Sequence, residues 1–186
     1  MKIVQREFSG DPDRQTMIAL ARAFPTENLH VVDLPYRLSS WALNNRDNIA
    51  LWVNAQDQLL AWAVTQTPFW TIDYTFCPDA DKSLHRQILA WADQRARQAL
   101  DTPSGHPCWF VMVFADQTDR IRDLERAGFV CQSDAVDDPW SKVLMLRSAQ
   151  IPVADYALPT GFRIRPFGGE NEVEAYVQLH RAVFQS

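Results

Sequence analysis

The side chains best suited to acid–base chemistry lie in a segment of strict alternation, residues 70–76. Its apolar side chains alternate with Thr71, Asp73 and Thr75, which predicts a strand with one apolar and one polar face. Asp73 and the neighbouring Tyr74 carry the ionisable groups of this segment, and such groups can act as a general base or a general acid. The alternative, which the alternation favours, is that Asp73 is a solvated carboxylate on the polar face.

The cysteines and histidines do not predict a metal site. Cys77, Cys108 and Cys131 lack CxxC spacing, and an odd number of cysteines does not indicate a disulfide framework. None of the four histidines lies three or four residues from another histidine or cysteine. We therefore expect no metal, and three reduced thiols in a reducing, cytoplasmic compartment.

Composition and charge exclude several classes of function. The 186 residues carry a net charge of −5 without a dense cluster of Lys and Arg, so we expect no nucleic-acid partner. The longest apolar run, residues 108–115, is too short to span a bilayer, and residues 1–8 contain no secretory signal. With 47% hydrophobic residues, the chain can form the core of one domain of about 150 residues, with a remainder.

Hydrophobic periodicity predicts the elements that would position these side chains. Strands are expected at 3–8, 48–53, 59–65, 70–76, 109–114, 129–132 and 143–146, and helices at 11–24, 33–41, 84–99 and 118–127. The three strands between 48 and 76 form an antiparallel meander. Residues 109–114 are apolar throughout, which is typical of a strand covered on both faces. This order predicts a mixed α/β sheet with helices on its faces.

The C-terminal residues repeat the N-terminal pattern after a linker. A shift of 159 residues gives six identities in the eighteen positions 6–23, including Arg6 with Arg165 and Gly10 with Gly169. Acidic residues stay in the first turn of the helix, where its dipole favours them. The alternative is two unrelated starts of a strand and a helix.

The order of elements over residues 1–147 resembles the GNAT superfamily of acetyl-CoA-dependent N-acetyltransferases. The resemblance is carried by the meander ending in Phe76-Cys77-Pro78-Asp79, the helix after it, residues 109–114, and Leu124-Glu125-Arg126-Ala127-Gly128-Phe129, which looks like the family's helix ending in Gly-Phe. It implies a GNAT-like acyl-CoA N-acyltransferase fold with a mostly antiparallel sheet and helices on both faces. This domain would cover residues 1–148, followed by a linker, 149–161, and the first strand and helix of an incomplete second GNAT-like domain, 162–186.

The resemblance also implies where acetyl-CoA would bind. The implied residues are Phe76, Cys77, Lys82, Ser83, Leu84, His85 and Arg86. The family's motif is Arg or Gln, two residues, Gly, one residue, then Gly or Ala, because glycines let the amides of a helix N-terminus approach a pyrophosphate. Here these positions hold Asp81, Leu84 and Arg86, so the motif is degenerate, and we expect Asp81 to cap the helix instead.

Two functions therefore remain open. The chain is either the N-terminal half of an N-acetyltransferase acting on a small-molecule or peptide amine, or a non-catalytic scaffold that supports a catalytic second domain. The family's acid Tyr is replaced by Leu124, and a family Asn by Gln117, so these residues alone are not certain to be an enzyme. The resemblance further implies that the strand 70–76 ends near Cys77 and splays from residues 109–114. We also expect residues 162–184 to be docked, and residues 162–186 to allow a homodimer by exchange between two copies.

Overall fold

The computed structural model describes residues 2–26, 34–38, 44–67, 69–103, 105–133, 148, 150–152 and 157–184, and the statements below concern these residues. The chain divides into two compact units, Met1–Pro139 and Trp140–Ser186, each of which is described by itself.

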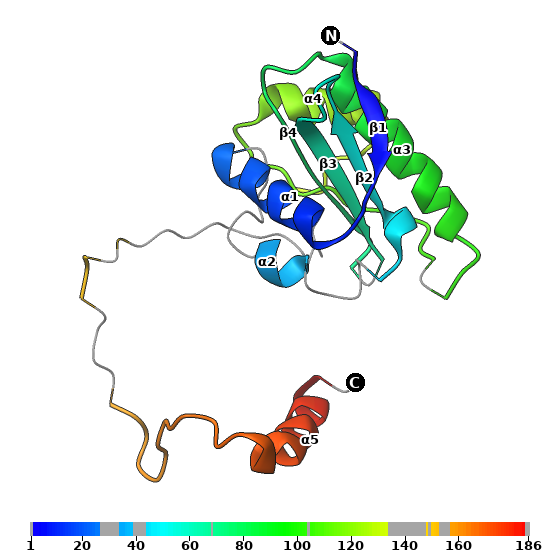
Figure 1. The fold of residues 1–186 in the computed structure, drawn as a ribbon. Helices are drawn as coiled ribbons and strands as arrows, with labels where there is room; N and C mark the ends of the chain where they lie inside the picture. Colours follow the sequence, from blue (N-terminus) through cyan, green and yellow to red (C-terminus); the bar gives the residue numbers. More distant parts are fainter. Residues whose placement is uncertain are drawn as a thin grey trace. The chain divides into compact units, whose positions relative to one another are not determined.

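The first unit is built on a four-stranded antiparallel sheet. Its strands are β1 (Val4–Glu7), β2 (Ile49–Val53), β3 (Leu59–Gln66) and β4 (Thr71–Phe76), and they lie side by side in chain order (Figure 1). The register places Arg6 opposite Leu51, and Ala63 opposite Tyr74. The predicted meander is confirmed, and β1 joins it as an edge strand beside β2.

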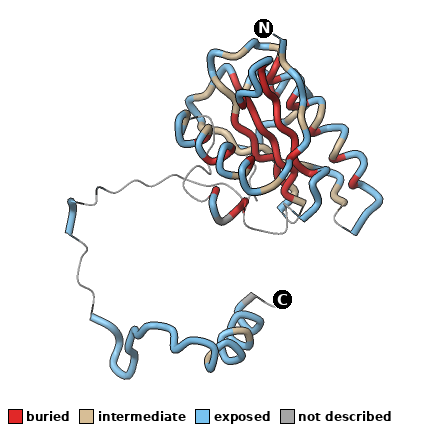
Figure 2. Tube along the Cα trace, in the orientation of Figure 1, coloured by how far each residue is buried: buried red, intermediate tan, exposed pale blue. Residues whose placement is uncertain are grey.

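Helices cover both faces of this sheet. Helices α1 (Asp11–Ala23) and α2 (Leu34–Arg37) pack on one face, and α3 (Ser83–Ala99) and α4 (Thr118–Arg126) on the other (Figure 1). The first core contains Met17 of α1 and Trp62 of β3, and the second contains Tyr74 of β4 and Leu84 of α3. The central strands are therefore buried along their lengths, as Figure 2 shows. The fold is a mixed α+β fold.

Two predicted strands of the first unit are wrong. Residues 109–114 form one parallel bridge, between Phe110 and Thr71, and residues 110–114 are half-buried rather than covered on both faces. Residues 129–132 are not a strand either. An apolar run shows that a segment contacts a core, but a strand also needs a neighbour along its backbone. The predicted strand 143–146, part of the predicted helix 33–41 and the expected linker residues 153–156 lie outside the described residues.

The second unit contains a short 3₁₀ helix, η3 (Glu170–Glu172), and α5 (Val173–Phe184). The predicted helix is thus confirmed, but residues 162–167 are not assigned as a strand. A strand needs a neighbouring strand to pair with, and the described residues of this unit contain no strand. In the described parts of the chain, no helix has the length and apolar character needed to cross a membrane.

Candidate functional site

Asp73 lies in a buried ion pair under α2. Arg37 donates from Nε to Asp73 Oδ2 at 2.8 Å and from Nη2 to Oδ1 at 2.9 Å. Gln66 donates to Oδ2 at 3.0 Å, and Arg37 also donates to the hydroxyl of Thr71. Asp73 is only 4% exposed. The interpretation of Asp73 as a solvated carboxylate is therefore wrong, because α1 and α2 cover this face of β4.

The ion pair with Arg37 also affects whether Asp73 can act as a general base. A general base must direct a lone pair at the proton that it removes. Both Asp73 oxygens already accept hydrogen bonds, in a bidentate charge-assisted pair with Arg37. The arrangement favours a positioning role, in which Asp73 holds α2 against the sheet. A catalytic role for Asp73 stays a prediction.

Tyr74 points to the opposite face of the sheet, into a buried polar network. Arg120 Nε donates to the Tyr74 hydroxyl oxygen at 3.1 Å, and the Tyr74 oxygen lies 2.9 Å from His85 Nε2. Arg120 can only donate, whereas either Tyr74 or His85 can donate the hydrogen bond between them, depending on the His85 tautomer. His85 Nδ1 lies 3.7 Å from Asp123 Oδ2.

The charge state of His85 follows from its surroundings. Burial lowers the pKa of His85, and the positive charge of Arg120 lowers it further, whereas Asp123 raises it. The net shift is downward, so His85 is neutral at neutral pH. His85 thus lies between the Tyr74 hydroxyl, to which it is hydrogen-bonded, and the Asp123 carboxylate, 3.7 Å from its Nδ1 atom.

This network borders a cleft beside α3. The cleft has a volume of about 1250 Å³ and includes His85 and Asp123 among its lining residues. Its apolar lining residues include Ile72, Leu89 and Phe110, and its basic ones include Lys82, Arg86, Arg97 and Arg126. Asp93 and Asp123 also line the cleft and pair with Arg97 and Arg126, at 2.8 and 2.9 Å. Apolar side chains together with Lys82 and Arg86 can hold an anion that carries an apolar chain.

The start of α3 is where the resemblance places the pyrophosphate. The Asp81 Oδ1 atom accepts a hydrogen bond from the Ser83 amide at 2.7 Å. Hydrogen bonding to the Ser83 side chain, and secondly to this amide, lowers the pKa of Asp81. The helix begins at Ser83, and Lys82 rather than Asp81 is at its N-cap position, without a side-chain cap hydrogen bond. The expectation that Asp81 is the N-cap is therefore wrong, although Asp81 does accept a hydrogen bond from the first amide of the helix.

The seven residues implied for acetyl-CoA do not form one surface. Leu84 is fully buried in the core, and His85 is buried against Tyr74. Lys82 and Arg86 are exposed, and Ser83 is half-buried. Phe76 and Cys77 are also half-buried; Phe76 stacks on the His85 ring, and the Cys77 amide donates to the Leu60 carbonyl.

The strand β4 and residues 109–114 diverge after a single contact. The Ile72 amide donates to the Phe110 carbonyl, and the Phe110 amide donates to the Trp70 carbonyl, both at 2.8 Å. No other residue of 109–114 pairs with β4, which ends at Phe76. The continuous pairing that would contradict the predicted splay is absent, but residues 109–114 are not a strand, so the splay of two strands stays a prediction.

Sequence reasoning missed the two arginines that organise these networks. Arg37 lies three residues after Leu34 and next to Leu38, on the buried stripe of its helix, and Arg120 lies four residues before Leu124 on the inner face of α4. An arginine on the apolar stripe of a helix could have indicated these networks, because a guanidinium that is buried there requires polar partners. Neither a protein-family model nor a curated protein matches the sequence.

Proposed function

We propose that the first unit is a GNAT-like domain without acetyl-transfer activity of its own, and that it supports a catalytic domain in a tandem acetyl-CoA-dependent N-acetyltransferase. The observation that carries this proposal is the hydrogen bond from the Ser83 amide to Asp81. A phosphate at a helix N-terminus needs free amides and is favoured by the positive end of the dipole. Here a carboxylate already occupies that end, and it would repel a pyrophosphate.

Three further positions support a structural role. Leu84, at a position where the family has glycine, contributes its whole side chain to the core between α3 and the sheet. Asp73, the candidate base, is engaged by Arg37 and Gln66. Leu124, at the position of the family's acid, is also buried in this core. The three positions thus contribute packing and ion pairing where an enzyme would need exposed chemical groups.

The second candidate is that this unit itself transfers an acetyl group to an amine. It is favoured by the divergence of β4 from residues 109–114 and by the basic cleft beside α3. Acetyl-CoA would then be the only cosubstrate, and no metal is required. Among the described residues, no group of His, Cys, Asp and Glu could hold a metal ion.

Calorimetric titration of acetyl-CoA into the chain tests the proposal. We expect no saturable heat with the native chain, and weak binding with Asp81→Ala, which frees the Ser83 amide. The matched control is Asp79→Ala, because Asp79 is exposed on the same loop and its loss changes the net charge equally. Micromolar binding by the native chain, about −8 kcal/mol, would contradict the proposal.

Restoring the whole family motif would not be an informative test. Replacing Leu84 by glycine would remove a fully buried side chain and place glycine inside α3. A Leu→Ala substitution in a core costs about 2–5 kcal/mol, and glycine adds about 1 kcal/mol in a helix. Loss of folding would then hide any gain in binding, so the single Asp81 substitution is the better experiment.

A further inference from the structure

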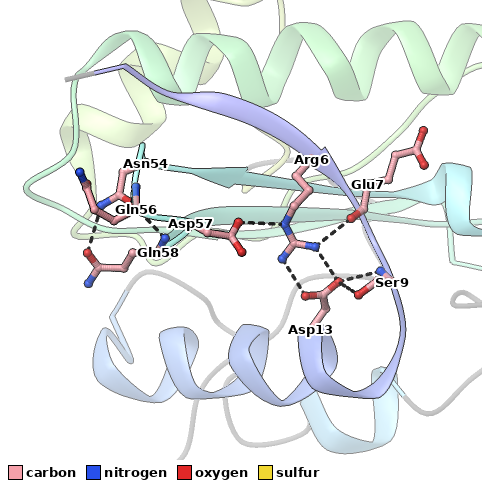
Figure 3. A network of polar contacts seen from close by, with 8 residues as sticks. All are labelled: Arg6, Glu7, Ser9, Asp13, Asn54, Gln56, Asp57 and Gln58. Carbon is pink, nitrogen blue, oxygen red and sulfur yellow. Dashed lines mark hydrogen bonds and ion pairs between the residues drawn. The ribbon is translucent and has the colours of Figure 1, made fainter.

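Residues 162–184 reproduce a local structure that is also present at the N-terminus. In the first unit, Arg6 donates to both carboxylate oxygens of Asp13, at 2.7 and 3.0 Å, and the Ser9 amide donates to the same carboxylate at 2.7 Å (Figure 3). In the second unit, Arg165 donates to both oxygens of Glu172, and the Gly168 amide donates to Glu172 at 2.6 Å. We call each arrangement an arginine clasp.

The two clasps agree in spacing and in backbone geometry. The arginine precedes the acid by seven residues, and the donating amide precedes it by four, in both units. Gly10 and Gly169 both have a positive φ, of 128° and 87°, immediately before the helical turn. The arginine hydrogen bond lowers the pKa of Asp13 and of Glu172 to about 2.

The two clasps differ at two positions, and the second difference compensates for the first. In the first, the Ser9 hydroxyl fills the space beside the carboxylate and donates to it at 2.8 Å. In the second, the longer Glu172 occupies that space, and a Cβ added at Gly168 would lie 2.8 Å from the Glu172 carboxylate. Asp13 with Ser9 in the first clasp, and Glu172 with Gly168 in the second, thus give the same arrangement of arginine, carboxylate and amide. This agreement argues against two unrelated starts of a strand and a helix.

In the first unit, the strand and helix that flank the arginine clasp are covered by the hairpin of β2 and β3. There β1 pairs with β2, and the helix buries Met17 and Ala21 completely against the sheet. Arg6 Nε also lies 3.4 Å from Asp57, in the turn between β2 and β3 (Figure 3). A β-hairpin thus supplies three things at once: a backbone partner for the strand, an apolar face for the helix, and a carboxylate for the arginine.

The second unit carries the same surface without that cover. Among its exposed apolar side chains, Tyr176 is 57% exposed, Leu179 63% and Val183 62%. Phe162 and Ile164, in the segment equivalent to β1, are exposed as well. Exposed apolar side chains that gather on one short segment mark an interaction site.

We infer that residues 162–184 form a docking surface for a β-hairpin from outside the first unit. One strand of this hairpin pairs antiparallel with residues 162–167, its apolar face covers Tyr176 and Val177, and its turn presents a carboxylate to Arg165. The inference rests on the repeated clasp and is independent of whether either unit binds acetyl-CoA.

The hairpin of the first unit, in this chain or in a second copy, does not fit this surface. The shift of 159 residues places Tyr176 at the position of Met17 and His180 at the position of Ala21. Both positions are fully buried in the first unit, so a tyrosine and a histidine would have no space there. The fitting hairpin has small residues opposite His180 and a polar group for the Tyr176 hydroxyl. A second copy of the chain, which would give the homodimer by exchange, is the competing occupant, and light scattering distinguishes the two.

A completed tandem tests the inference. Residues 26–139 are appended after residue 184 of the full chain, because position 184 corresponds to position 25. Residues 162–184 then serve as the first strand and helix of a second copy of the sheet. One version keeps the native residues, and one carries Tyr176→Met and His180→Ala. In the reference version, residues 161–184 are replaced by a second copy of residues 2–25. Hydrogen exchange of the amides in the segment equivalent to α1 is measured in all three.

We expect the substituted version to match the reference, with amides at 176–183 exchanging at least about tenfold more slowly than in the unmodified chain. The native version should show no such protection. Absence of protection in the substituted version would overturn the docking surface, and equal protection in the native version would overturn the fit argument. Light scattering adds an independent result. We expect the unmodified chain to be a monomer, and a dimer that is lost on removing residues 160–186 would assign the surface to a second copy instead.

Discussion

At the scale of single residues, the polar groups between the sheet and its helices determine what each face can do. Asp73 and Arg37 form a closed pair that joins β4 to α2. Tyr74, His85 and Arg120 form a chain of hydrogen bonds on the other face, at the edge of the cleft. Asp73 and Tyr74, successive residues of one strand, therefore belong to two separate buried polar networks on opposite faces of the sheet.

Arg37→Met should destabilise the first unit strongly, because it leaves the Asp73 carboxylate buried without its cation. Removal of one partner of a buried pair costs about 3–5 kcal/mol. Urea unfolding measures this cost, with Arg46→Met, an exposed arginine, as the matched control. The double variant Arg37→Met with Asp73→Leu should recover most of the loss. A cost below about 1 kcal/mol for Arg37→Met would show that the pair does not hold α2 on the sheet.

His85 should make the stability of the first unit depend on pH. The folded state lowers the pKa of His85 below 6.5, so the unfolded chain binds the proton more readily. Stability is therefore complete above pH 6.5 and is lost as the pH falls below that value. In His85→Gln this part of the dependence should disappear, whereas in His106→Gln, outside the Tyr74 network, it should remain. An unchanged profile in His85→Gln would contradict the neutral, buried state of His85.

At the scale of elements, the arginine clasp fixes how the first strand turns into the first helix. The Ser9 amide and the guanidinium of Arg6 converge on Asp13, in the first turn of α1. Gly10 takes the positive φ that this turn needs. The helix has no side-chain cap at Gly10 itself, so the Asp13 clasp is what anchors its N-terminus.

Arg6→Ala should lower the free energy of unfolding by about 1–3 kcal/mol, the value of hydrogen bonds to a charged group. Arg14→Ala removes an exposed pair with Asp11 and should cost at most about 1 kcal/mol. The clasp lowers the pKa of Asp13 from 3.8 to about 2, so its contribution is complete above 3.8 and is lost as the pH falls toward 2. Acid titrations monitored by circular dichroism should show a shallower loss over this range in Arg6→Ala; equal slopes would exclude the clasp as the cause.

Local patterns predicted the elements whose pairing is local. The meander was predictable because alternation and short turns join β2, β3 and β4 in chain order. Residues 109–114 were mispredicted because their apolar run says nothing about which backbone lies beside them. The polar face of β4 was mispredicted because its cover, Arg37 on α2, is 36 residues away in the sequence. The shift of 159 residues aligned the clasp arginines, yet only the structure shows the clasp itself.

At the scale of the whole molecule, the two units play different parts in the proposed function. The first has two cores, one on each face of its sheet, and its helix start is closed by its own carboxylate. The second presents an apolar surface of the type that the first unit buries. This division fits a supporting domain joined to the beginning of a second domain, as we propose.

The most direct test of the account is the response of the α3 amides to acetyl-CoA. Amide NMR spectra of the native chain are recorded during a titration to about 1 mM, where a binding free energy of about −4 kcal/mol gives half-saturation. The account predicts that the amides of Ser83, Leu84 and His85 do not shift, because Asp81 already accepts from the first of them. Saturable shifts of these three amides in the native chain would contradict it.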